Sequence, residues 1–137
     1  MAKEPKSQPP RQPASQPTDA ELAILQVLWS GGPSTVRQVH ETLSSRRTTG
    51  YTTTLKLMQI MVDKRLVVRD ESQRSHIYRA QLSQDRAQRQ LVRSLLDQAF
   101  EGSAKGLILQ ALATRRASAA ELSEIRDLLD SLDGDKK

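Results

Sequence analysis

Residues 50–70 read GYTTTLKLMQIMVDKRLVVRD, and this stretch decides the fold. Three threonines open a helix that we predict from about Gly50 to Lys64, with Thr49 as its N-cap. At about 100° per residue, one side of this helix collects Thr54, Leu57, Met58 and Met61, which are expected to face the core. From Leu66 onward the helical period ends and β-branched residues follow, which indicates a strand.

Two more helices are predicted before this stretch and a second strand after it. TDAE at 18–21 is a capping box, in which the threonine hydroxyl accepts from the glutamate amide and the carboxylate reaches back. The first helix ends at GGP, residues 31–33, and the second runs from Ser34 or Thr35 to about Ser45. Leu66–Arg69 and Ser75–Ala80 should pair as a hairpin. The pattern predicts a winged helix-turn-helix domain over residues 18–82, within a mainly α protein of the α+β type.

The segments on either side of this domain differ from it in composition. Residues 1–17 hold five of the six prolines and little that could be buried, so we expect a disordered tail. Residues 83–137 should form further helices, rich in leucine, that need a second copy of the chain to cover their apolar faces. Alternatively, these helices fold back on the winged domain. The residues expected at the interface of a homodimer are Leu91, Leu95, Leu107, Ile108, Leu112, Leu122, Ile125, Leu128 and Leu129.

The distribution of charge favours a nucleic-acid partner. The formal net charge is +5, and residues 1–82 hold 12 Lys/Arg against 7 Asp/Glu, whereas residues 83–137 hold 9 of each. The whole positive excess therefore lies with the predicted winged domain, where phosphate backbones are a natural partner. The charge alone also fits a protein–protein adaptor in which the basic surplus is incidental.

The outward side of the predicted third helix carries residues suited to reading DNA. In a helix-turn-helix, the second helix of the motif enters the major groove and its N-terminal side chains meet base edges. Threonine can donate, accept or touch a thymine methyl, so Thr52 and Thr53 fit this role, with Lys56 and Gln59 one turn and two turns further on. The alternative is that the threonines only cap an exposed turn.

Phosphate contacts are expected around this helix. The Tyr51 hydroxyl is placed to contact the DNA backbone at the start of the helix. The loop before the helix and the tip of the wing flank the groove in a docked winged helix, so arginines there should neutralise phosphates. These arginines are Arg37, Arg46, Arg47 and Arg74.

Several functional classes are excluded by what the sequence lacks. There is no cysteine, and the two histidines, His40 and His76, are too few for a histidine-based metal site. No catalytic motif or glycine-rich phosphate loop is present, so we expect neither an enzyme nor a cofactor or metal. No apolar run approaches the roughly 20 residues that cross a bilayer, and no signal peptide is visible, so a cytoplasmic protein is expected.

Three segments resemble a known family. TDAELAILQVLWSGGPSTVRQVHETL, YTTTLKLMQIMVDKRLVVRD and RSHIYRA follow one another as they do in the penicillinase-repressor (BlaI/MecI/CopY) family of bacterial transcription regulators. The resemblance runs from about Thr18 to the end and is strongest through Ala80. It implies a dimeric repressor, with a winged helix and a helical dimerisation region, that binds palindromic double-stranded operators, often with TACA/TGTA half-sites. It also assigns Thr52, Thr53 and Lys56 to DNA.

The resemblance carries two implications about release from DNA. Copper-responsive members have a cysteine-rich metal site, which this chain cannot form. Drug-responsive members, which control resistance genes, are cut at an Asn–Phe bond after a membrane sensor metalloprotease is triggered. The aligned pair here is Gln110–Ala111, so a protease partner acting at this bond is one alternative and another signal that weakens the dimer is the other.

Overall fold

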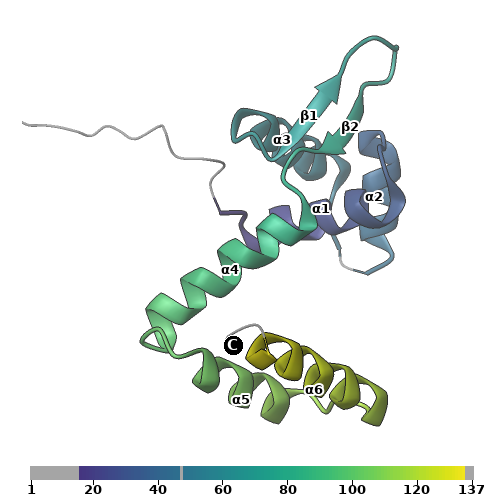
Figure 1. The fold of residues 1–137 in the computed structure, drawn as a ribbon. Coiled ribbons are helices and arrows are strands. Elements are labelled where there is room, and N and C mark those ends of the chain that lie inside the picture. The colour runs from purple at the N-terminus through teal and green to yellow at the C-terminus, as the bar shows by residue number, and fades with distance from the viewer. Residues whose placement is uncertain (1–15, 47, 135–137) are drawn as a thin grey trace, which may run out of the picture. The chain divides into compact units, whose positions relative to one another are not determined.

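The computed structural model describes residues 16–46 and 48–134. These residues fall into two units that divide between Val92 and Arg93, and each is described by itself. The elements, labelled in Figure 1, are α1 (Asp19–Gly31), α2 (Val36–Ser44), α3 (Tyr51–Asp63), β1 (Val67–Asp70), β2 (Ile77–Ala80), α4 (Gln84–Ala99), α5 (Ala104–Thr114) and α6 (Ala119–Gly134). The prediction of a mainly helical protein with a winged helix-turn-helix is confirmed. Most of the tail expected over 1–17 lies outside the described residues.

The capping box predicted at the start of α1 is present. The Glu21 amide donates to the Thr18 hydroxyl at 3.2 Å, and the Thr18 amide donates to Glu21 Oε1 at 3.0 Å. At the other end, Gly32 adopts φ +81°, and its amide donates to the Leu28 carbonyl. A left-handed backbone at this position favours glycine, which explains why the helix stops at GGP.

α2 and α3 form the helix-turn-helix, and each begins in its own way. α2 opens with a second capping box, between Thr35 and Gln38. For α3 the expected cap, Thr49, is wrong: the N-cap is Gly50, and no side chain caps the helix. The Gly50 carbonyl accepts the Thr54 amide at 3.1 Å, which is the ordinary backbone bond of a helix, and also the Thr54 hydroxyl at 3.3 Å.

β1 and β2 form the predicted antiparallel hairpin, which is the wing. Its register pairs Val67 with Ala80 and Asp70 with Ile77. At the tip, the Ser72 amide donates to Asp70 Oδ1 at 2.9 Å, and this bond lowers the pKa of the Asp70 carboxyl. An isolated bridge between Ser34 and Tyr78, with N–O distances of 2.9 and 2.8 Å, ties the wing to the turn between α1 and α2.

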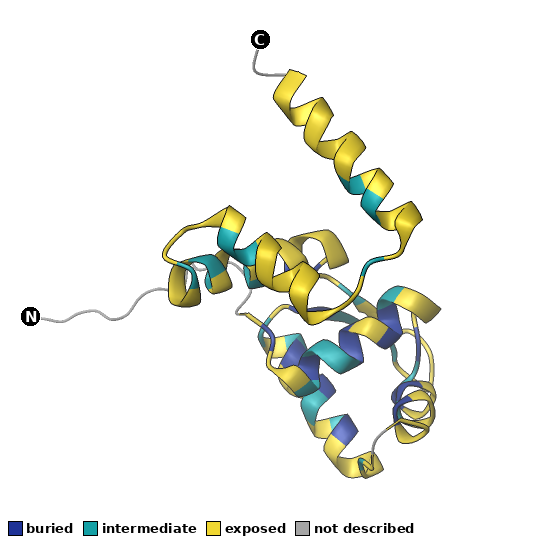
Figure 2. Ribbon diagram, turned by 90° about the horizontal axis from the view of Figure 1, so that it is seen from below, coloured by how far each residue is buried: buried dark blue, intermediate teal, exposed yellow. Residues whose placement is uncertain are grey.

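The core of the first unit lies among α1, α2, α3 and the hairpin, where the buried residues of Figure 2 gather. Ile24, Leu25, Val39, Met58 and Met61 are fully buried in it. Leu82 and Ala87, from the linker and first turn of α4, are also buried in this core. The Trp29 indole N–H donates to the Leu82 carbonyl at 3.0 Å, so α1 holds the start of the linker to α4.

The helices of the second unit are much more exposed. α5 and α6 bury no residue, and α6 is exposed along almost its whole length (Figure 2). Because α4 runs across the division between the units, the domain boundary expected at 82/83 stays a prediction. Within the described residues, no helix combines the length and the apolar character needed to span a bilayer.

Candidate nucleic-acid interface

α3 presents a polar face and buries the opposite one. Thr54, Met58 and Met61 are buried, as the spacing predicted, whereas Leu57 is only half-buried at the border of the two faces. The side chains expected to read DNA are all exposed: Thr52, Thr53, Lys56 and Gln59. They occupy the side of the helix that packing leaves free, and their donors and acceptors are available to base edges.

Ile60 belongs to the same exposed face, and the sequence reasoning did not single it out. It is 39% exposed. At about 100° per residue it falls between Thr53 and Lys56 around the helix axis. An exposed branched apolar side chain among polar neighbours can make the apolar contact that a thymine methyl offers. The helical period already contained this signal, because Ile60 does not share the stripe of Met58 and Met61.

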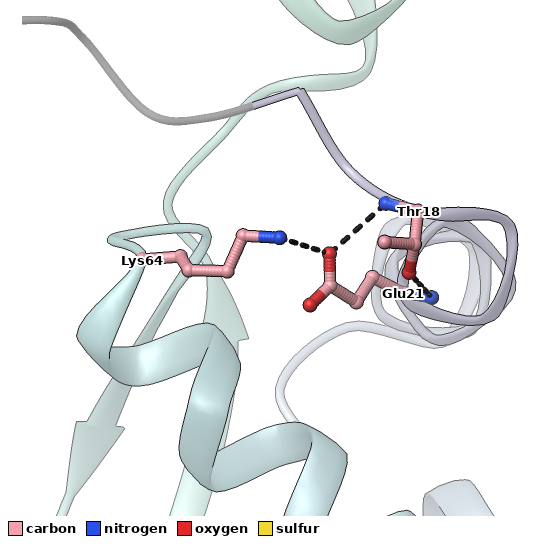
Figure 3. Close-up of polar contacts among 3 residues, drawn as sticks. All are labelled: Thr18, Glu21 and Lys64. Atoms are coloured by element: carbon pink, nitrogen blue, oxygen red, sulfur yellow. Dashed lines mark hydrogen bonds and ion pairs between the residues drawn. The ribbon is translucent and has the colours of Figure 1, made fainter.

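The C-terminal end of α3 is held by an ion pair to the start of α1. Lys64 Nζ lies 2.6 Å from Glu21 Oε1, and the Glu21 side chain is only 3% exposed (Figure 3). Burial raises the pKa of the Glu21 carboxyl. Hydrogen bonds from Lys64 and from the Thr18 amide together lower this pKa by more than burial raises it, so the net pKa lies below its ordinary value. Next to Lys64, Arg65 turns the chain toward β1 with φ +64°.

Tyr51 at the start of α3 contacts two side chains of α2. The guanidinium carbon of Arg37 lies 5.5 Å from the centroid of the tyrosine ring, within the range of a cation–π contact. The His40 ring also contacts the tyrosine ring in a T-shaped arrangement, with centroids 5.7 Å apart and planes at 85°. The sequence predicted a role for Tyr51 and Arg37 but did not predict the contact between His40 and Tyr51.

A cleft of about 380 Å³ lies where α2, the start of α3 and the wing meet. It brings together Arg37, Tyr51 and Arg74, three of the residues expected to contact the DNA backbone. Arg46, just after α2, is exposed but does not line the cleft, and Arg47 lies outside the described residues. The structure thus gathers part of the predicted phosphate-binding set and leaves Arg46 apart.

The cations of the wing have different partners. Arg69 Nε donates to Glu71 Oε2 at 2.8 Å, and hydrogen bonds to Tyr78 and Glu71 raise the pKa of Arg69. Arg74, by contrast, forms no ion pair within the part of the chain that the structure describes. The Arg74 guanidinium, at the tip of the wing, is therefore better placed than that of Arg69 to bind an external anion.

Comparison with known proteins identifies the family of this chain. The family described as "Penicillinase repressor" matches residues 17–131. The chain belongs to the penicillinase repressor family. Two proteins named "Transcriptional regulator BlaI", from two strains of Mycobacterium tuberculosis (CDC 1551 / Oshkosh and ATCC 25618 / H37Rv), are each 34% identical to it over 116 residues. That stretch covers 84% of this chain and 83% of each relative.

Membership of the penicillinase repressor family confirms the resemblance seen in the sequence and the prediction that the protein is not an enzyme. The matched residues include the winged helix, α4, α5 and most of α6. Of the nine residues expected at a dimer interface, four are half-buried: Leu91, Leu107, Leu122 and Ile125. Five are exposed: Leu95, Ile108, Leu112, Leu128 and Leu129. Gln110 and Ala111 are exposed within α5.

Proposed function

We propose that the protein is a homodimeric, sequence-specific transcriptional repressor that occupies a palindromic operator in double-stranded DNA. The observation that carries this proposal is the face of α3, where Thr52, Thr53, Lys56 and Gln59 stay exposed while Met58 and Met61 anchor the helix in the core. Family membership supports a regulator of transcription, and the basic surplus of residues 1–82 supports a DNA partner.

In this proposal α3 is the recognition helix. Thr52 and Thr53 contact base edges, Lys56 reaches a guanine or a phosphate, and Gln59 reads adenine. Tyr51 and the arginines around the helix contact the backbone, which positions the protein without reading sequence. Two copies place two such helices about one turn of DNA apart, roughly 34–36 Å, or a multiple of it. A two-fold operator then mirrors the symmetry of the protein.

The second copy of the chain is proposed to cover the apolar faces of α4, α5 and α6. Leu128, Leu129 and Leu132 are each more than half exposed on α6 alone. Leaving so many large apolar side chains in water is unfavourable, by roughly 25 cal/mol per Å² of apolar surface. A dimer interface removes that surface from water and links the DNA-binding units of the two copies.

Release from the operator is proposed to follow from loss of the dimer. A single half-site binds weakly, and the tether raises the effective concentration of the second unit, so a signal that separates the copies ends repression. Cleavage within α5, at or near Gln110–Ala111, is one such signal, and a membrane sensor metalloprotease would be the partner that starts it. Because the pair is not Asn–Phe, another signal that weakens the dimer is the alternative.

The test is the salt dependence of binding to a duplex selected by the protein from a random library. A repressor that makes at least five phosphate contacts should give a log–log slope of affinity against salt of roughly −4 or steeper. Binding to a scrambled duplex of the same composition serves as the control for specificity. The rival function, a protein–protein adaptor built on a winged helix, predicts that no duplex is enriched and that the salt slope is flat.

A further inference from the structure

The cleft between α2, α3 and the wing has the chemistry of an anion site. Its basic lining residues are Arg37, Arg74 and His76, and no carboxylate lines it. Arg37 and Arg74 form no ion pairs among residues 16–46 and 48–134. Arginine offers a planar set of N–H donors that matches the oxygens of a phosphate, so two arginines at one cleft favour that group over other anions.

The backbone of α2 adds to this preference. Thr35, the N-cap of α2, lines the cleft, so the helix begins there and its positive dipole end lies at the cleft. Tyr51 and Ser75, which also line the cleft, each carry a hydroxyl group that can donate. Two guanidinium groups, a helix N-terminus and hydroxyl donors are the groups that bind phosphate oxygens elsewhere in proteins.

Arg37 already has an aromatic partner in the cleft. Its guanidinium lies over the Tyr51 ring, and the His40 ring makes a T-shaped contact with the same tyrosine. An arginine that is already held against an aromatic face loses less conformational freedom when it binds, and its N–H edge remains free for a bidentate contact. Arg37 is therefore the stronger of the two expected ligands, with His40 as a positioning residue behind Tyr51.

The size of the cleft restricts the ligand. About 380 Å³ exceeds what a bare phosphate ion needs and lies near the lower end of the range for small-molecule pockets, roughly 300–1,000 Å³. Val36, Leu55 and Tyr78 give the cleft an apolar part, which suits the carbon atoms of a sugar. A phosphate ester of a sugar fits both the charge and the volume.

We propose that this cleft binds one sugar–phosphate ester, with Arg37 and Arg74 on its phosphate oxygens. Two sources carry this chemistry: a backbone phosphate of DNA, in which case the inference rests on the proposed function, and a free phosphorylated sugar, which would compete with DNA for the same cleft. Both sources require Arg37, which links α2 to the recognition helix through Tyr51.

The first arm of the test uses DNA. In the duplex that the protein selects, each phosphate in turn is replaced by an uncharged methylphosphonate, and affinity is measured for the wild type and for Arg37→Gln. A substitution at one phosphate per half-site should weaken the wild type by roughly 10-fold and leave Arg37→Gln unchanged there, because the contact is already lost. Arg116→Gln, an exposed arginine before α6, is the matched control and should behave as the wild type at every position.

The second arm uses 2-deoxyribose 5-phosphate with the uniformly ¹⁵N-labelled full chain, and deoxyribose as the uncharged control. Saturable amide shifts at Thr35, Arg37, Tyr51 and Ser75, absent in Arg37→Gln, indicate binding of the free ester in the cleft. If a methylphosphonate weakens the wild type but not Arg37→Gln, and no saturable amide shift is seen, the cleft binds the operator backbone. If only the saturable amide shifts are seen, the cleft binds a free ligand. No coupling at any phosphate together with no saturable shift overturns the inference. Failure to enrich any duplex counts against the proposed function, and the NMR arm then decides the inference by itself.

Discussion

Lys64 Nζ lies 2.6 Å from Oε1 of Glu21, and this ion pair joins the end of α3 to the start of α1 across 43 positions of sequence. The same carboxylate oxygen accepts the Thr18 amide at 3.0 Å, so one atom serves both the cap of α1 and the anchor of α3. A helix proposed to read DNA must be held firmly if its side chains are to meet base edges in register. The pair therefore connects the stability of the winged domain to the placement of the face of α3 that we propose reads DNA.

Removing the lysine should destabilise the domain more than the loss of a surface ion pair. Lys64→Met leaves the Glu21 carboxylate buried with one partner fewer, and we expect a loss of about 2 kcal/mol in the free energy of unfolding. Urea unfolding at pH 7, followed by the fluorescence of Trp29, the chain's one tryptophan, measures it. Trp29 reports on the folding of this domain because its indole N–H is hydrogen-bonded to the Leu82 carbonyl.

The control for that substitution is the exposed pair of Asp85 and Arg89 on α4. Its N–O distance is 3.3 Å, and both side chains are about 70% exposed, at 70% and 73%. Arg89→Met should change the free energy of unfolding by less than about 0.5 kcal/mol. Equal losses in the free energy of unfolding for Lys64→Met and Arg89→Met would show that burial of Glu21 does not strengthen its ion pair with Lys64.

The free energy of unfolding should depend on pH because the Glu21 carboxyl becomes protonated in acid. Because the pKa of Glu21 in the folded protein lies below its unfolded value, the ionised form favours folding. Its contribution is complete above the unfolded pKa of about 4.3 and is lost as the pH falls through the lower folded pKa. The wild type should therefore be more stable than Glu21→Gln at pH 7, and the difference should shrink toward pH 3. Urea unfolding of both proteins across this range checks it, and a constant difference would contradict the assignment.

Base readout and backbone contact should separate in two alanine variants. Thr53→Ala removes a group proposed to touch base edges, so sequence preference should relax, with a loss of roughly 1–3 kcal/mol on the selected duplex and little change on others. Arg74→Ala removes a proposed phosphate contact, so affinity should fall on all duplexes alike and the salt slope should become shallower by about 1. Competition binding on selected and scrambled duplexes measures both. If both variants lost affinity for all duplexes alike, Thr53 would not be a residue that contacts base edges.

A charge on α6 should separate the proposed dimer. Leu128 is 58% exposed, so Leu128→Glu leaves the packing of a single chain intact but places a carboxylate in the interface. We expect monomers in sedimentation or size-exclusion measurements, with weak operator binding, and the same for Leu129→Glu. Ser123→Glu adds the same charge at an exposed polar position of α6 and should stay dimeric. An unchanged dimer in both leucine variants would move the interface away from this face.

Features that depend on neighbours in the sequence could be predicted, and features that join distant residues could not. The capping box of Thr18 and Glu21 spans three residues, and the hairpin follows from alternation over a few positions, so both are visible in the chain. The bridge between Ser34 and Tyr78 and the bond from Trp29 to Leu82 span 44 and 53 positions and leave no local signal. For the same reason, neither the lysine partner of Glu21 nor the contacts of Tyr51 with Arg37 and His40 could be predicted.

Thr54 is a polar residue at a fully buried position of α3, and its hydroxyl should be dispensable. The hydroxyl donates to the Gly50 carbonyl at 3.3 Å, but that carbonyl also accepts the Thr54 amide at 3.1 Å. Thr54→Val keeps the shape of the side chain and leaves no buried group without a partner, so the free energy of unfolding should stay within about 0.5 kcal/mol of the wild type. Met58→Ala on the same face opens a cavity and should cost about 3 kcal/mol. A loss above about 1.5 kcal/mol in Thr54→Val would mean that its hydroxyl is needed to hold the first turn of α3.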